Sequence, residues 1–181
     1  MEVPRHIKLI LGIGNPGTEY EDTYHNAGLL ALEHLAAADG AGVFRRPSRK
    51  SFTSARGAHF LFARSLTFMN ASGASAREAC AFLKVSPNAL AVLHDESDLS
   101  LGTFQCAFGK GAAGHKGIAS IVEALGTSGF WRIRIGIRPK EAVRRKAGAF
   151  VLSRMRPGDR AALTRIFAEI ASSLGLEGKA E

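Results

Sequence analysis

The sequence predicts an α/β protein with a single domain built around a largely parallel β-sheet. Short apolar runs typical of buried strands alternate along the chain with segments that have the periodicity of amphipathic helices. The chain has 181 residues, of which 46% are hydrophobic and 22% charged, a balance suited to one compact domain with a full core. The sequence contains no internal repeat and no low-complexity linker, so one domain over residues 1–181 is expected.

The first half of the chain is predicted to contain three strands and two helices. Residues 7–13 (IKLILGI) form an apolar run typical of a buried strand, and the turn-forming sequence GNPG at 14–17 closes it. Asn26 is expected to cap a helix over residues 27–38, which carries one mostly apolar face. The other expected elements are a basic irregular segment at 45–56, a strand at 59–64, a helix at 75–83 and a strand at 90–94.

The second half continues the alternation of strands and helices. Strict alternation over residues 131–137 predicts a strand with its isoleucines on one face and Arg132 and Arg134 on the other. Residues 140–155 form a basic connector, and its loose patterning is compatible with a lid. The other expected elements are a strand at 103–108, a glycine-rich loop at 109–117, a helix at 118–125 and a C-terminal helix from Pro157 to about residue 174.

Charge is the most informative bulk property of the sequence. The formal net charge is +8 and the isoelectric point is near 10.0. Each phosphate that a cationic side chain neutralises releases condensed counterions, so a strongly basic protein binds polyanions favourably. The charge therefore favours a nucleic-acid partner.

The sequence gives no sign of a membrane or secretory protein. Its apolar runs are too short to cross a bilayer, and its first residues lack the pattern of a signal peptide. Cys80 and Cys106 match no zinc or redox spacing, so both are expected to be reduced thiols in apolar surroundings. We therefore expect a cytosolic protein with no membrane partner.

The segment Gly12 to Gly17 satisfies the G-x-G-x-x-G pattern of dinucleotide-binding proteins. That pattern requires a helix directly after the last glycine, with its N-terminus facing a pyrophosphate. Here the next helix is expected only after Asn26, and Glu21 and Asp22 lie where a phosphate would have to approach. The segment is therefore predicted to be a turn that does not bind a nucleotide.

Four segments together resemble, in order and spacing, the motifs of bacterial peptidyl-tRNA hydrolases over about residues 7–155. They are LGIGNPG at 11–17 with Tyr20 and HNAG at 25–28, TFMNASG at 67–73, HDESDL at 94–99, and FWRIRIGI at 130–137. The resemblance implies a twisted mixed sheet with helices on both faces. It also implies hydrolysis of the ester that joins a peptide to the 3′ ribose of tRNA, without a cofactor or metal. We expect a monomer whose partner is peptidyl-tRNA.

The resemblance also implies roles for individual residues. His25 matches the catalytic base of the family, and Asp95 matches the carboxylate that orients it. Imidazole is the side chain best suited to take a proton from water near neutral pH, and a carboxylate on its other nitrogen fixes the tautomer. The positions that match residues lining the substrate cleft are Asn15, Tyr20, Phe68 and Asn70. The amides among them are able to donate to a developing oxyanion, and the aromatic rings to pack on adenosine or peptide.

The glycine-rich loop departs from the family pattern at two positions. Ala112 stands where the family usually has a histidine, and Lys116 stands where it has an asparagine that contacts substrate. Lys116 keeps hydrogen-bond donors, loses the acceptor and adds a charge that can meet a tRNA phosphate. We therefore predict an active enzyme with altered affinity for tRNA. The cations expected to contact the tRNA body are Arg132, Arg134, Arg144, Arg145 and Lys146.

Two other readings remain open from the sequence. In the first, the chain is an RNA-binding module of the same fold that has lost turnover; the loop changes favour this reading, and the retained His25 and Asp95 oppose it. In the second, the chain is a metalloprotease-like relative: hydrogenase-maturation endopeptidases share the GIGN opening, but their downstream acidic motif is not at the place where it would be needed. Dependence of the activity on metal would separate this reading from the hydrolase. The segment His94 to Asp98 also looks like a cluster of metal ligands, but His94 and Asp95 on one strand point to opposite faces.

Overall fold

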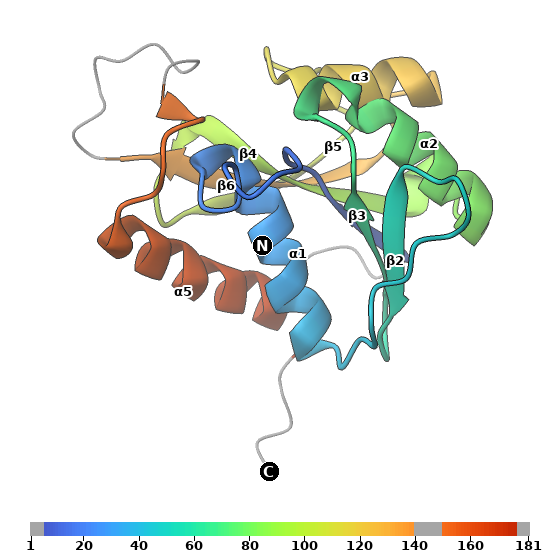
Figure 1. Ribbon diagram of the computed structural model, residues 1–181, viewed down its shortest axis with the longest axis horizontal. Helices are drawn as coiled ribbons and strands as arrows, with labels where there is room; N and C mark the ends of the chain where they lie inside the picture. Colours follow the sequence, from blue (N-terminus) through green and yellow to red (C-terminus); the bar gives the residue numbers. More distant parts are fainter. Residues whose placement is uncertain (1–5, 140–149, 177–181) are drawn as a thin grey trace.

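The computed structural model describes residues 6–139 and 150–176 of the chain. Six strands form one sheet in the order β2-β3-β1-β4-β6-β5 (Figure 1). The pairs β1–β3, β1–β4 and β4–β6 are parallel, whereas the edge strands β2 and β5 run antiparallel to their neighbours. The strands are β1 (Leu9–Gly12), β2 (Phe52–Arg56), β3 (Leu61–Ser65), β4 (Leu90–Ser100), β5 (Phe104–Phe108) and β6 (Trp131–Arg138).

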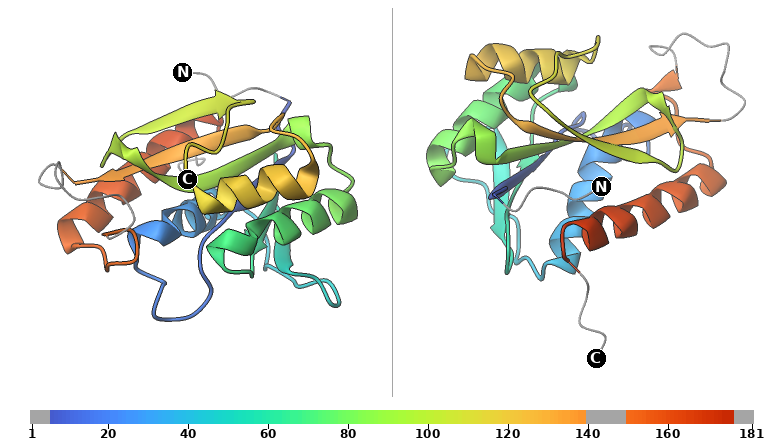
Figure 2. Two further views of the ribbon diagram at one scale, coloured as in Figure 1. Left: turned by 90° about the horizontal axis from the view of Figure 1, so that it is seen from above. Right: turned by 180° about the vertical axis from the view of Figure 1, so that it is seen from behind.

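Helices cover both faces of this sheet, as Figures 1 and 2 show. One face carries α1 (Ala27–Ala38) and α5 (Pro157–Ser173), and the other carries α2 (Ser72–Leu83) and α3 (Lys116–Leu125). Three short 3₁₀ helices are η1 (Tyr24–Asn26), η2 (Met69–Ala71) and η3 (Pro87–Ala89). The predicted α/β class, with a mixed and largely parallel sheet between two helical layers, is confirmed.

The alternation of side chains along the strands creates two hydrophobic cores. In β1, Ile10 packs into the core under α1 and α5, whereas Leu9 and Leu11 pack into the core under α2 and α3. In β6, Ile133 and Ile135 join the first core, as the sequence predicts. A strand whose side chains are buried on both faces reads as a continuous apolar run, which explains the pattern IKLILGI.

Most predicted elements are present; strand β4 is longer than predicted, and strand β2 was not predicted. Helix α1 has the predicted bounds, and α5 begins at Pro157 as expected. Strand β4 extends from the predicted end at residue 94 to Ser100, because its polar half still pairs with β6. Strand β2 lies in a segment that was expected to be irregular; it is an edge strand in which only Phe52 and Ala55 are buried, so it lacks a clear apolar alternation.

Part of the expected basic connector lies outside the described residues. This part is 140–149, with Arg144, Arg145 and Lys146, and the expectation of a lid over 140–155 therefore stays a prediction. No helix within residues 6–139 and 150–176 is both long and apolar enough to cross a lipid bilayer.

Gly28 brings α1 very close to the backbone of two strands, β1 and β4. A Cβ atom at this position would lie 2.3 Å from the carbonyl oxygen of Leu93 and 2.8 Å from that of Ile13. Only a residue without a side chain fits there, so the first turn of α1 rests directly on the end of β1 and on the backbone of β4 at Leu93. The residues just before this helix are thereby placed beside the residues that follow Leu93.

Candidate active site

A cleft of about 700 Å³ lies beside the carboxyl ends of β1, β3 and β4. Ligands of open α/β sheets usually bind at this edge, because loops of several strands converge there. Tyr20 lies at the side of the cleft, where its ring meets Phe68 edge to face with 6.3 Å between centroids. The predicted site residues that line the cleft are His25, Asp95, Asn15, Phe68, Asn70 and Lys116.

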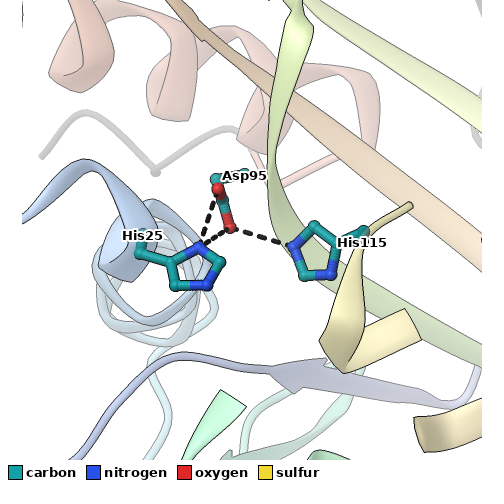
Figure 3. A group of neighbouring side chains, drawn as sticks. All are labelled: His25, Asp95 and His115. Carbon is teal, nitrogen blue, oxygen red and sulfur yellow. Dashed lines mark hydrogen bonds and ion pairs between the residues drawn. The ribbon is translucent and has the colours of Figure 1, made fainter. Parts of the chain in front are cut away.

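His25 and Asp95 are in direct contact (Figure 3). The Nδ1 atom of His25 lies 2.9 Å from both carboxylate oxygens of Asp95, whose side chain is 3% exposed. Burial alone would raise the pKa of Asp95, but hydrogen bonds and charges from His115 and His25 lower it below its ordinary value. Asp95 is therefore a carboxylate that accepts the Nδ1–H of His25, which leaves the lone pair of His25 on Nε2.

The backbone around His25 is fixed by a segment from the far end of the chain. The N–H of His25 donates to the carbonyl of Val151 at 2.8 Å, and the N–H of Met155 donates to the carbonyl of Asp22 at 2.8 Å. The hydroxyl of Tyr24 donates to Asp159 in the first turn of α5. Burial, together with this carboxylate, raises the pKa of Tyr24 to about 12. His25 thus sits on a short helix held by contacts that are distant in sequence.

His115 is a site residue that the sequence analysis missed. Its Nε2 lies 3.1 Å from Oδ1 of Asp95, so the carboxylate is shared by two imidazoles (Figure 3). Its Nδ1 accepts the N–H of Ile118 at 3.3 Å and so caps the N-terminus of α3. Nδ1 is therefore the acceptor and Nε2–H the donor, so both ring nitrogens are occupied. A histidine directly before a predicted helix, in the same loop as Lys116, was the available signal.

The segment His94 to Asp98 does not form a cluster of metal ligands. His94 is fully buried, and burial followed by the nearby His115 holds its pKa well below the ordinary value. Glu96 pairs with Arg134, and Asp98 pairs with Arg138. Within the described ranges, the group with the geometry to share an ion is instead His25, Asp95 and His115, whose ligand atoms lie within 4.8 Å of one another.

Asn15 is held by a network that also corrects the expected role of Asn26. The side chain of Asn26 does not cap α1; its Oδ1 accepts the N–H of Asn15 at 2.7 Å, and its Nδ2 donates to the carbonyl of Asn15 at 3.0 Å. Oδ1 of Asn15 accepts the N–H of Met69 at 2.8 Å. The Nδ2 group of Asn15 has no partner in the described part of the chain and lies in the wall of the cleft.

The prediction that Arg132 contacts tRNA is wrong, because the structure buries this side chain. It is 4% exposed, and its guanidinium donates to the carbonyl of Gly111 at 2.9 Å, so it anchors the glycine-rich loop instead of facing solvent. Desolvation, with Arg134 nearby, lowers the pKa of Arg132 from its ordinary value. Lys116, by contrast, is exposed at the first residue of α3 and lines the cleft.

The twisted sheet brings together one imidazole, one buried carboxylate and several side-chain amides. This combination defines a protein with a site for general-base chemistry. The family is shown by comparison with known proteins. The chain belongs to the peptidyl-tRNA hydrolase family, whose model matches residues 9–178.

Individual relatives and solved structures agree with this assignment. The chain is 40% identical over 158 residues to a peptidyl-tRNA hydrolase of Sorangium cellulosum (strain So ce56), covering 86% of this chain and 71% of that protein. It is 38% identical over 175 residues to one of Geobacter metallireducens, covering 93% and 87%. The crystal structure of peptidyl-tRNA hydrolase from Acinetobacter baumannii superimposes with a TM-score of 0.85 at 30% identity, covering 97% of this chain and 90% of the other.

Proposed function

We propose that the protein hydrolyses the ester between a peptide and the 3′-terminal ribose of tRNA, with His25 as the general base. The observation that carries this proposal is the contact between Nδ1 of His25 and Asp95, which leaves Nε2 free to accept a proton. Nε2 takes a proton from water as the water oxygen attacks the ester carbonyl. The tetrahedral intermediate then collapses, and the imidazolium returns the proton to the departing ribose oxygen.

Asp95 stabilises the imidazolium that forms during the attack. Its lowered pKa keeps it ionised, so it supplies a negative charge 2.9 Å from the nitrogen that becomes part of the cation. The base is a side chain of the protein, and we propose that the reaction needs neither a metal nor a cofactor.

The amides of the cleft supply selectivity for peptidyl-tRNA. Nδ2 of Asn15 and the side chain of Asn70 are donors that suit the last peptide carbonyl and the developing oxyanion. An aminoacyl-tRNA presents a free ammonium in place of the peptide amide, so it would match these groups poorly. We assign Phe68 and Tyr20 to packing on the terminal adenosine or the peptide, and Lys116 to a tRNA phosphate.

The test of this proposal uses N-acetyl-aminoacyl-tRNA and free aminoacyl-tRNA as substrates, with EDTA present. Selective cleavage of the acetylated substrate is expected, and His25→Ala should lower its rate by on the order of 10²–10⁴. His59→Ala is the matched control, because His59 also pairs with a carboxylate, that of Asp39, but outside the cleft. Absence of cleavage with intact tRNA binding would favour the RNA-binding module instead, and loss of activity in EDTA would favour a metal enzyme.

The proposal also covers the oligomeric state and the cellular location of the protein. We assign a cytoplasmic monomer, consistent with a substrate made by cytoplasmic ribosomes. Sedimentation of the purified protein should give one species near 19.3 kDa. A larger species at micromolar concentration would refute the monomer.

A further inference from the structure

The loop before β2 and the adjoining surface of α2 gather five cations, which we name the β2–α2 basic surface: Arg45, Arg46, Arg49, Lys50 and Arg77. We infer that this surface binds the phosphodiester backbone in the body of the tRNA substrate. The inference rests on the proposed function and assigns a second contact region outside the cleft.

The cations of this surface lack acidic partners. None of the five takes part in an ion pair within residues 6–139 and 150–176. The carboxylate of Glu78, the residue after Arg77, already accepts the backbone N–H of Ser51 at 2.7 Å and its hydroxyl at 2.9 Å. Those hydrogen bonds, and then the charges of Lys50 and Arg77, hold the pKa of Glu78 below its ordinary value. Unpaired like charges repel one another, and a polyanion relieves that repulsion.

Hydrogen bonds hold the backbone of the loop that carries most of these side chains. Arg45 and Ser54 exchange two backbone hydrogen bonds of 2.9 Å, which tie the start of the loop to β2. Nε of Arg46 donates to the carbonyl of Lys50 at 2.8 Å, which closes the turn. Arg49 has a φ of 56°, a left-handed conformation that is unfavourable for a residue other than glycine. A strained turn held by its surroundings is commoner at functional sites than elsewhere.

The basic surface lies next to the cleft. The backbone N–H of Leu66 donates to the carbonyl of Ser51 at 2.9 Å, so the end of the loop is joined to the exit of β3. Phe68, in the wall of the cleft, comes two residues after Leu66. An RNA whose 3′ end enters the cleft can therefore place upstream phosphates across this side of the molecule.

On the opposite side of the cleft, the three arginines of β6 are already engaged. There Arg134 pairs with Glu96, Arg138 pairs with Asp98, and Arg132 is buried. A phosphate arriving on that side would compete with a carboxylate for Arg134 or Arg138. Within the described residues, none of the five cations on the β2–α2 side forms such an ion pair, which is why we place the second contact there.

The test is the triple variant Arg45→Gln, Arg49→Gln and Arg77→Gln, which changes three exposed side chains without hydrogen-bond partners in the described chain. The matched control, Lys8→Gln, Lys84→Gln and Arg165→Gln, removes the same charge from exposed positions outside this surface. Affinity for deacylated tRNA is measured against salt concentration, and KM and kcat are measured for N-acetyl-aminoacyl-tRNA and for an N-acetyl-aminoacyl trinucleotide that lacks the tRNA body.

We expect the triple variant to raise KM for the full substrate by about tenfold at 0.15 M salt, with kcat and the trinucleotide unaffected. Its slope of log K against log salt should be shallower by about two to three, since each lost phosphate contact removes about 0.9. Equal behaviour of variant and control, or an equal loss on the trinucleotide, overturns the inference. If the wild type hydrolyses neither substrate, the proposed function fails, while the tRNA-binding comparison still decides this inference.

Discussion

The two histidines on either side of Asp95 have the same carboxylate partner but different surroundings. His25 gives Nδ1–H to Asp95 and keeps Nε2 without a partner in the described part of the chain. His115 gives Nε2–H to the same carboxylate, and its Nδ1 accepts the N–H of Ile118. Only His25 has a nitrogen that can take a proton from water without breaking an existing hydrogen bond.

This difference separates a base from a positioning residue. His25 belongs to a segment fixed by Val151 and Ser153, whereas His115 belongs to the glycine-rich loop and the start of α3. Asp95 lies between them in the middle of β4 (Leu90–Ser100) and accepts from both. The role of each imidazole follows from what occupies its second nitrogen.

The largest effect is expected from Asp95→Asn, which changes the partner of both histidines at once. Nδ1 of His25 lies 2.9 Å from both carboxylate oxygens of Asp95, so the NH₂ group of an asparagine would face Nδ1 in either orientation. His25 would then carry its proton on Nε2, the charge that stabilises the imidazolium would be lost, and kcat should fall by on the order of 10²–10⁴. KM should change little. A variant that retains most of the wild-type kcat would show that Asp95 does not set the tautomer of His25.

Two substitutions of His115 separate its two hydrogen bonds. His115→Asn keeps an acceptor that can cap α3 but removes the donor to Asp95, and it should lower kcat by roughly tenfold, the equivalent of about 1.4 kcal/mol. His115→Gln keeps a donor that can reach Asp95 but loses the cap of α3. It should lower the unfolding free energy by about 1 kcal/mol and lower kcat by less than His115→Asn does. If either variant were as inactive as His25→Ala, His115 would be the proton acceptor and the comparison would be reversed.

A smaller effect is expected from Lys116→Asn, next to His115. The change removes one charge from the cleft, so KM for N-acetyl-aminoacyl-tRNA should change several-fold and its salt dependence should weaken by about one unit of slope. Lys110→Asn serves as control, because Lys110 lies in the same loop, is exposed and does not line the cleft. An unchanged KM would exclude a role of Lys116 in substrate binding.

The smallest effect on turnover is expected from Tyr24→Phe, beside His25. Loss of the hydrogen bond to Asp159 should cost about 1–2 kcal/mol of unfolding free energy. Because the pKa of Tyr24 is raised to about 12, the contribution of its hydroxyl to the unfolding free energy is complete below pH 10. That contribution disappears as the pH rises through 12. Chemical denaturation between pH 9 and 12 should therefore show a flatter loss of stability in the variant, and a parallel loss in both proteins would contradict this origin.

The elements that were predicted correctly have strong local patterns. Helix α1 and strand β6 have clear apolar periodicity, strand β1 is a continuous apolar run, and each was predicted to within two or three residues. Strand β2 was missed because its edge position leaves most of its side chains partly exposed, and the polar end of β4 was missed because pairing with β6 holds it in place. Pairing partners that are distant in sequence leave no local signal.

At the site, residue types could be predicted but their contacts could not. His25 and Asp95 meet as expected, yet the shared contact with His115 depends on how the loop before α3 folds over β4. Asn26 was expected to cap a helix because its type and position fit, but its amide is used by the turn at Asn15. Arg132 has the alternation of an exposed residue, and the glycine-rich loop covers it.

Gly28 has a consequence for how this protein can vary. A methyl group there would meet the carbonyl oxygen of Leu93 at 2.3 Å and would push α1, together with His25 three residues earlier, away from Asp95. In a mutational scan, position 28 should therefore tolerate as few residues as the base itself, although it touches no substrate. The absence of a Cβ atom at Gly28 therefore sets how closely His25 can approach Asp95.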